Sequence, residues 1–101
     1  MKKIIKHSRF YVYIVKCQDK TYYTGYTPDV ERRIELHNSG KGAKYTRDRR
    51  PVKLVWCKEY RYLHYAMSAE YRIKRLNKRQ KILLIRGMCL DKVMSKKRSK
   101  G

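Results

Sequence analysis

The sequence predicts a small α+β domain in which a three-stranded, mostly antiparallel sheet is flanked by helices, in the order β-β-α-β-α-α. Three observations lead to this prediction. Two segments rich in β-branched and aromatic residues flank a short polar turn, a third such segment follows a proline, and apolar residues recur at helical spacing later in the chain. A length of 101 residues suits one domain.

The first two strands are predicted as a hairpin. Residues 10–15, FYVYIV, are β-branched or aromatic throughout, and residues 21–26, TYYTGY, resume the same composition. Between them Gln18-Asp19-Lys20 supplies turn chemistry. We therefore expect two antiparallel strands joined by a short connection.

A helix is predicted to follow the hairpin. Thr27 suits the cap position and Pro28 the first helical position, where its missing N–H costs nothing. Gly40 or Gly42 can end the segment. Residues 41–50 then read as a polar, strongly basic loop, which is closed by Pro51.

The rest of the domain is predicted as a strand and two helices. Residues 52–57, VKLVWC, read as a strand, and the apolar residues in 62–76 recur at spacings of three and four. Asn77 and Gln80 resemble a capping box for a further helix, which is interrupted near Gly87. We divide the chain into a basic lead (1–8), a domain (9–90) and a basic, disordered tail (91–101).

Charge is the strongest indication of the kind of partner. The chain has 28 Lys and Arg against 8 Asp and Glu, a formal net charge of +20. So many like charges on one small domain repel each other, and a dense polyanion relieves that repulsion by exchanging its condensed counterions. Nucleic acid is therefore the leading partner class. Attraction to anionic membranes is a weaker alternative, because no predicted helix has the strongly apolar face it requires.

Other features of the composition limit the setting. Ten Tyr and one Trp favour a small, tyrosine-rich core. Three widely separated cysteines fit neither a disulfide framework nor a zinc knuckle, and no apolar run is long enough to cross a bilayer. We expect a cytoplasmic protein with reduced cysteines.

Glu70 is an unusual acidic residue in this basic chain. On a helical wheel of residues 62–76 it borders the apolar stripe. One interpretation makes its carboxylate a ligand for magnesium or manganese. The other, favoured by position alone, pairs it with a basic neighbour such as Arg72 or Lys74.

Arg33 and His37 are four residues apart, so both project from one side of the predicted helix. Arg33 can bind phosphoryl oxygens and His37 can donate a hydrogen bond or move a proton. The alternatives are an arginine on a solvated face and a cation at the helix C-terminus. Tyr13 and Tyr23 stand in adjacent strands, where packing is the simpler explanation and a shared site the other.

A basic segment follows the first helix. Its cations, interleaved with an aromatic ring, suggest a surface that follows a nucleic-acid backbone and stacks a base, whereas the alternative is a solvated loop. The residues of this predicted nucleic-acid-binding segment are Lys41, Lys44, Tyr45, Arg47, Arg49, Arg50 and Lys53.

Taken together, these positions resemble the GIY-YIG nuclease superfamily, in particular its small single-domain bacterial branch related to structure-specific endonucleases. YVY stands at 11–13, YTG at 23–25, an arginine at 33 and a helical glutamate at 70, and the resemblance runs from about residue 10 to 85. The first motif has Tyr-Val in place of Gly-Ile, and Thr24 replaces isoleucine in the second. Neither departure removes a proposed chemical group.

The resemblance implies roles for the candidate residues. Tyr13 and Tyr23 match the motif tyrosines, Arg33 the catalytic arginine and Glu70 the metal-binding glutamate. It also implies phosphodiester hydrolysis with one divalent metal, Mg or Mn, on DNA more than RNA, with branched or flapped DNA among the substrates. Tyr13, Tyr23 or His37 would orient or deprotonate the attacking water, with the charge of Arg33 and the metal lowering a tyrosine pKa.

These residues predict that two phenols, a guanidinium and a carboxylate converge in one shallow pocket. The resulting hypothesis is a metal-dependent endonuclease. The alternative hypothesis is a noncatalytic, basic nucleic-acid-binding module that retains the nuclease fold.

Overall fold

A computed structural model of the chain describes residues 9–96. Within this range the backbone forms a three-stranded sheet and five helices. In chain order they are β1 (Phe10–Lys16), β2 (Tyr22–Thr27), α1 (Val30–Asn38), α2 (Lys44–Arg47), β3 (Lys53–Tyr60), α3 (Leu63–Lys74), α4 (Lys78–Ile85) and α5 (Leu90–Lys96).

The sheet has β1 at its centre and the order β2-β1-β3. Both pairings are antiparallel, with Tyr13 opposite Gly25 in β2 and opposite Cys57 in β3. The predicted α+β class and antiparallel three-stranded sheet are therefore confirmed. Because β2 is an edge strand, its outer side is open, and groups from both faces of the sheet can meet there.

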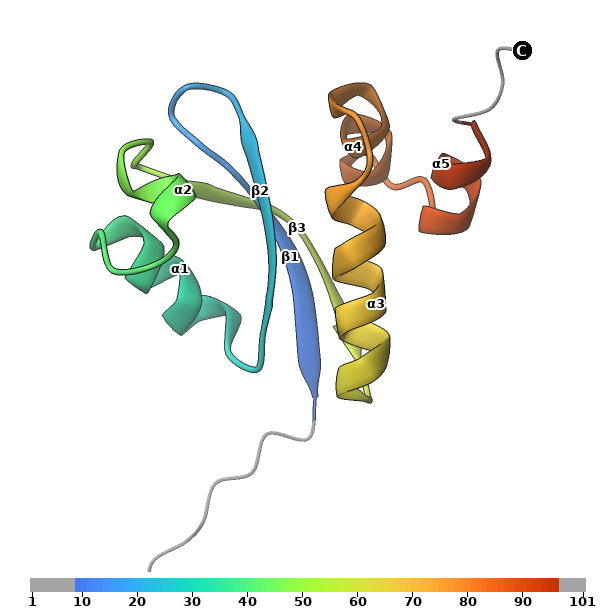
Figure 1. The fold of residues 1–101 in the computed structure, drawn as a ribbon, viewed down its shortest axis with the longest axis horizontal. Coiled ribbons are helices and arrows are strands. Elements are labelled where there is room, and N and C mark those ends of the chain that lie inside the picture. The colour runs from blue at the N-terminus through green and yellow to red at the C-terminus, as the bar shows by residue number, and fades with distance from the viewer. Residues whose placement is uncertain (1–8, 97–101) are drawn as a thin grey trace, which may run out of the picture.

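Helices cover both faces of the sheet (Figure 1). The helices α1 and α2 lie on one side, and α3, α4 and α5 lie on the other. Successive side chains of a strand point to opposite faces. Accordingly Val12 and Ile14 join the core beneath α3, whereas Tyr13 and Val15 join a second cluster on the α1 side.

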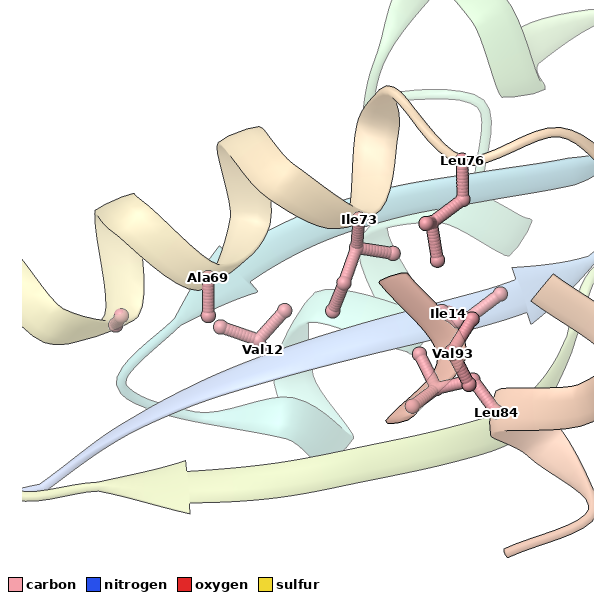
Figure 2. Close-up of a cluster of buried hydrophobic side chains, with 8 residues drawn as sticks. Val12, Ile14, Ala69, Ile73, Leu76, Leu84 and Val93 are labelled. Atoms are coloured by element: carbon pink, nitrogen blue, oxygen red, sulfur yellow. The ribbon is translucent and has the colours of Figure 1, made fainter. Parts of the chain in front are cut away.

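The larger core is aliphatic. Figure 2 shows Val12 and Ile14 of β1 packed against Ala69 and Ile73 of α3, with Leu84 of α4 close by. The expectation of a tyrosine-rich core is wrong, because Tyr13 is the only fully buried tyrosine of residues 9–96. The phenol hydroxyl needs a partner when it is buried, so most of the rings stay near water. The exposed tyrosines are Tyr26, Tyr45, Tyr62, Tyr65 and Tyr71.

The N-cap of α1 lies two residues after the predicted cap, Thr27. It is Asp29, whose carboxylate accepts a hydrogen bond from the Arg32 backbone N–H at 3.1 Å. Thr27 instead ends β2, and its Oγ1 accepts from the Asp29 N–H at 3.1 Å. An acidic cap also interacts favourably with the positive end of the helix dipole. The predicted end at Gly40 is matched by its positive φ of 87° just beyond the helix.

The helices α3 and α4 follow the predicted pattern, and α2 and α5 are additions to it. The short α2 forms within the segment expected to be a loop. The predicted capping box of α4 is confirmed, since Asn77 Oδ1 accepts from the Gln80 N–H at 2.8 Å and Gln80 Oε1 accepts from the Asn77 N–H at 2.9 Å. No helix in the described part of the chain has the length and apolarity needed to cross a membrane.

The end of the chain differs from the expected division at residue 90. Residues 91–96, placed in the disordered tail, belong to α5, and Val93 is fully buried in the larger core. Apolar side chains at Leu90, Val93 and Met94 have helical spacing, which the surrounding charges obscured. The expected lead (1–8) and the last part of the tail (97–101) lie outside the described residues.

Candidate active site

Tyr13 is the innermost residue of the site. It lies on central strand β1, on the face toward α1, and is fully buried. Its hydroxyl oxygen lies 2.8 Å from His37 Nε2 and accepts a hydrogen bond from Arg33 Nε at 3.4 Å. The phenol therefore joins the two residues that the sequence placed on one side of α1.

His37 continues this chain of contacts away from the sheet. Its Nδ1 lies 2.8 Å from Thr46 Oγ1, and that hydroxyl donates to the Ala43 carbonyl at 3.1 Å. Since the threonine proton is used there, Nδ1 donates to Oγ1 and Nε2 accepts the proton of Tyr13. The Ala43 N–H, 3.5 Å from Nδ1, is too distant to compete.

Burial keeps the Tyr13 phenol and the His37 ring neutral. It lowers the pKa of His37 from 6.5 to about 4, with the Arg33 charge acting in the same direction. Burial also raises the pKa of Tyr13, against the opposing hydrogen bond and charge of Arg33. His37 is thus not a helix C-terminal cation. Arg33 lowers the pKa of Tyr13 as expected, but desolvation outweighs this effect, so the pKa is raised overall.

Two glycines provide the space for these side chains. A Cβ at Gly25 would lie 2.6 Å from the Tyr13 hydroxyl oxygen, and a Cβ at Gly42 would lie 2.5 Å from His37 Nδ1. Both distances are far below van der Waals contact. The glycine of the YTG motif therefore makes room for the buried phenol.

Tyr23 is the more accessible of the two motif tyrosines. It lies on edge strand β2, on the same face as Tyr13, and is half-buried. Its ring centroid is 5.3 Å from that of His37 and 5.7 Å from that of Tyr45, with which it stacks. Lys74 Nζ lies 5.8 Å from the same centroid. The Tyr23 phenol therefore connects the buried residues with the protein surface.

Glu70 approaches the site from the other face of the sheet. Its helix α3 packs over β1 and β2 with Ala69 and Ile73 against the core. The Glu70 side chain is 17% exposed and binds Lys74 Nζ at 3.1 Å, so the predicted ion pair is present. Its charge still contributes to the raised pKa of Tyr13. Lys74, the partner of Glu70, also lies beside the Tyr23 ring, so the side chains of α3 reach the β2 edge although α3 and α1 lie on opposite faces (Figure 1).

The donor set limits the kind of metal site available. Residues 9–96 contain no group of three or more His, Cys, Asp or Glu side chains arranged to hold a metal. Magnesium is often bound through only one or two carboxylates, with water and substrate phosphate as the other ligands. The half-buried Glu70 fits that role as a single anchoring ligand, once Lys74 gives up the carboxylate.

The predicted nucleic-acid-binding segment divides into two groups. Arg49 pairs with Asp19 at 3.0 Å and lies 4.1 Å from the Tyr45 ring centroid, while Arg50 Nε donates to the Arg47 carbonyl at 2.8 Å. Through these contacts Arg49, Arg50 and Tyr45 already interact with other groups of the protein. The remaining members are Lys41, Lys44, Arg47 and Lys53, which are exposed, as are Tyr45 and Arg50.

Sequence reasoning missed Thr46, which belongs to this site, and Lys81, a neighbour of Lys74. Thr46 was hidden in a basic segment read as a loop, and only α2 brings its hydroxyl to His37. Lys81 is placed near Lys74 by the fold, and burial and that neighbouring charge lower its pKa. Asn77, which the sequence left without a role in the site, is used as the cap of α4.

Comparison with known proteins gives consistent similarities. Residues 9–82 match the family model described as the GIY-YIG catalytic domain. A UPF0213 protein of Staphylococcus haemolyticus is 53% identical over 78 residues, which cover 77% of this chain and 95% of that protein. The UPF0213 protein YazA of Bacillus subtilis is 47% identical over 75 residues, covering 74% and 76%.

Two solved structures are also similar. The solution NMR structure of a UPF0213 protein from Bacillus halodurans has 44% sequence identity and a TM-score of 0.53, and covers 92% of this chain and 99% of that one. The solution NMR structure of a protein from E. faecalis has 41% identity and a TM-score of 0.56, covering 77% and 83%.

Proposed function

The chain belongs to the GIY-YIG family, and from this premise we propose that it hydrolyses phosphodiester bonds of DNA with one divalent metal ion, Mg²⁺ or Mn²⁺. The observation that carries the proposal is the half-exposed Arg33 guanidinium, held from below by buried Tyr13 and, through it, by His37. A cation fixed in this way is suited to bind a phosphate in one orientation.

Arg33 binds the substrate in this proposal. Its Nε is directed at Tyr13, which leaves the terminal guanidinium N–H groups for the nonbridging oxygens of a phosphodiester. Negative charge grows on those oxygens in the transition state, and a preorganised cation stabilises it without reorganising. Arg33 is therefore the catalytic residue whose loss should cost most.

The two tyrosines have different roles. Tyr13 is fully buried and its hydroxyl donates a hydrogen bond to His37, so it acts as a positioning residue for Arg33. Tyr23 is half-buried and lies at the open edge of the sheet, so its phenol oxygen is available to accept a hydrogen bond from the attacking water. His37 is buried with both ring nitrogens engaged, and it supports Tyr13.

Glu70 is the residue that would hold the metal. When bound there, the ion would stabilise charge on the leaving oxygen. Glu70 pairs with Lys74 at 3.1 Å, and Lys74 is free to contact phosphate when it leaves the pair. DNA is the proposed polymer because of the match to the GIY-YIG catalytic domain, and the exposed cations of residues 41–53 suit a phosphate backbone.

The test is cleavage of labelled single-stranded, duplex and flapped DNA, and of RNA, with and without Mg²⁺ or Mn²⁺. The variants are Arg33→Ala and Glu70→Gln, and Arg79→Ala is the control, an equal loss of charge on the exposed side of α4. We expect metal-dependent cutting by the wild type and by Arg79→Ala, and a loss of at least a hundredfold in Arg33→Ala and Glu70→Gln.

Binding separates this function from the alternative. Each variant is titrated against the same DNA in EDTA by fluorescence anisotropy. Cutting that disappears while binding changes little supports the nuclease. Binding of DNA without cutting by any form, with either metal, would show instead the noncatalytic nucleic-acid-binding module.

A further inference from the structure

The exposed surface of α3 carries aromatic rings that the core does not use. The helix buries Ala66, Ala69 and Ile73 on its inner side. On its exposed sides Tyr65 and Tyr71 are 54% and 61% exposed, and Tyr62 at its N-cap is 53% exposed. Surface helices usually turn charged residues to the solvent, and exposed apolar surface marks a site of interaction.

These rings are held in defined arrangements by their neighbours. At the start of the helix the His64 ring centroid lies 4.2 Å from that of Tyr65, which in turn lies 5.9 Å from that of Tyr62. Toward the end, the Arg75 guanidinium lies 5.6 Å from the Tyr71 centroid and donates to its hydroxyl at 3.3 Å. The two groups present ring surfaces to solvent at little further cost in side-chain entropy.

Charge identifies the partner that suits this surface. Of the residues from Arg61 to Arg75, Glu70 alone is acidic, and Lys74 neutralises it. A second copy of this chain would bring another charge of +20 to the same surface, which is unfavourable. The partner should therefore be negatively charged and should offer flat rings. A nucleic acid meets both conditions only where its bases are unpaired, because paired bases are already stacked in the duplex.

We propose that the exposed rings of α3, Tyr62, Tyr65 and Tyr71, form a stacking surface for unpaired bases of a nucleic acid, with Arg61 and Arg75 binding the adjoining phosphates. The surface extends about 20 Å along the helix from Tyr62 to Arg75. This proposal rests on the proposed function in one respect. The same helix carries Glu70, so a nucleic-acid strand bound along α3 is directed toward the proposed active site. The stacking surface is separate from the basic segment of residues 41–53.

The experiment measures binding in EDTA, so that cleavage has no influence on it. Three fluorescent DNAs of equal length are compared by anisotropy at the same salt concentration: oligothymidine, a blunt duplex and an abasic single strand. The abasic strand has the phosphates of the first ligand without its bases. The variants are Tyr65→Ala/Tyr71→Ala and, as the matched control, Tyr65→Phe/Tyr71→Phe, which keeps both rings.

We expect the wild type to bind oligothymidine at least tenfold more tightly than the abasic strand. The alanine variant should lose at least tenfold in affinity for oligothymidine and keep its affinity for the abasic strand and the duplex, while the phenylalanine variant binds like the wild type. Equal binding of oligothymidine by the alanine variant and the wild type would overturn the proposal. So would a wild-type dimer in sedimentation that the alanine variant lacks, because the rings would then serve self-association. Loss of cleavage in Arg33→Ala tests the nuclease independently of these results.

Discussion

Acidification should destabilise the fold through one residue, His37. Its pKa is lowered from 6.5 to about 4 by burial and by Arg33, so the folded protein keeps it neutral where the unfolded chain would protonate it. Between these two values the unfolded state binds more protons, and the free energy of unfolding therefore decreases as the pH falls from 6.5 toward 4. Between about pH 7 and pH 5 the loss amounts to about 2 kcal/mol.

The assay is urea unfolding of the wild type and of His37→Gln at both pH values. The variant lacks the titrating ring and leaves the hydroxyls of Tyr13 and Thr46 to find other partners, so it should be less stable at pH 7. Its free energy of unfolding should nevertheless change much less with pH than that of the wild type. Few carboxyl groups titrate above pH 5, which keeps their contribution to the comparison small.

An NMR titration measures the same quantity directly. The ring signals of His37 should show no protonation until the pH approaches 4. Equal pH dependence of stability in the wild type and His37→Gln would refute the reasoning, as would a His37 pKa near 6.5. Either result would mean that the ring has access to water in the folded protein.

Three further predictions concern the stability of the fold, and a fourth concerns the binding of DNA by the positive charge. Gly25→Ala places a Cβ against the Tyr13 hydroxyl and should cost about 2 kcal/mol or more of stability. Asn77→Ala removes the cap of α4 and should cost about 1 kcal/mol, whereas Asn77→Gly should cost only a few tenths. Val93→Ala should cost about 2 kcal/mol if α5 packs as described. DNA affinity should decrease steeply and linearly on a double-logarithmic plot against salt concentration.

Urea unfolding measures the first three, and anisotropy titrations at several salt concentrations measure the fourth. Stability unchanged by Gly25→Ala would show that the phenol can move away without loss, and equal effects of the two Asn77 substitutions would argue against the capping box. A Val93→Ala variant as stable as the wild type would show that residues 91–96 do not pack on the core. Affinity independent of salt would contradict binding through phosphates.

The strands and helices that the sequence predicted are those determined by neighbouring residues. Alternating β-branched and aromatic residues predict strands whatever surrounds them, and the Asn77 and Gln80 side chains cap the helix that they themselves begin. The hairpin, the third strand and the main helices all depend on patterns within a few neighbouring residues. The helix α5 was not predicted, because three apolar residues among charged ones form too weak a pattern. Its position depends on the packing of Val93 in the core.

The sequence by itself determined the α+β class, the excess of positive charge and the identity of the candidate side chains, because each follows from composition and short-range spacing. Only the tertiary structure decided which of them are buried and which are open. Packing beneath α1 keeps Tyr13 and His37 buried and neutral, whereas Tyr23 on edge strand β2 is half-buried, with Lys74, the ion-pair partner of Glu70, 5.8 Å from its ring centroid. Desolvation depends on every neighbour at once, so no local pattern encodes it.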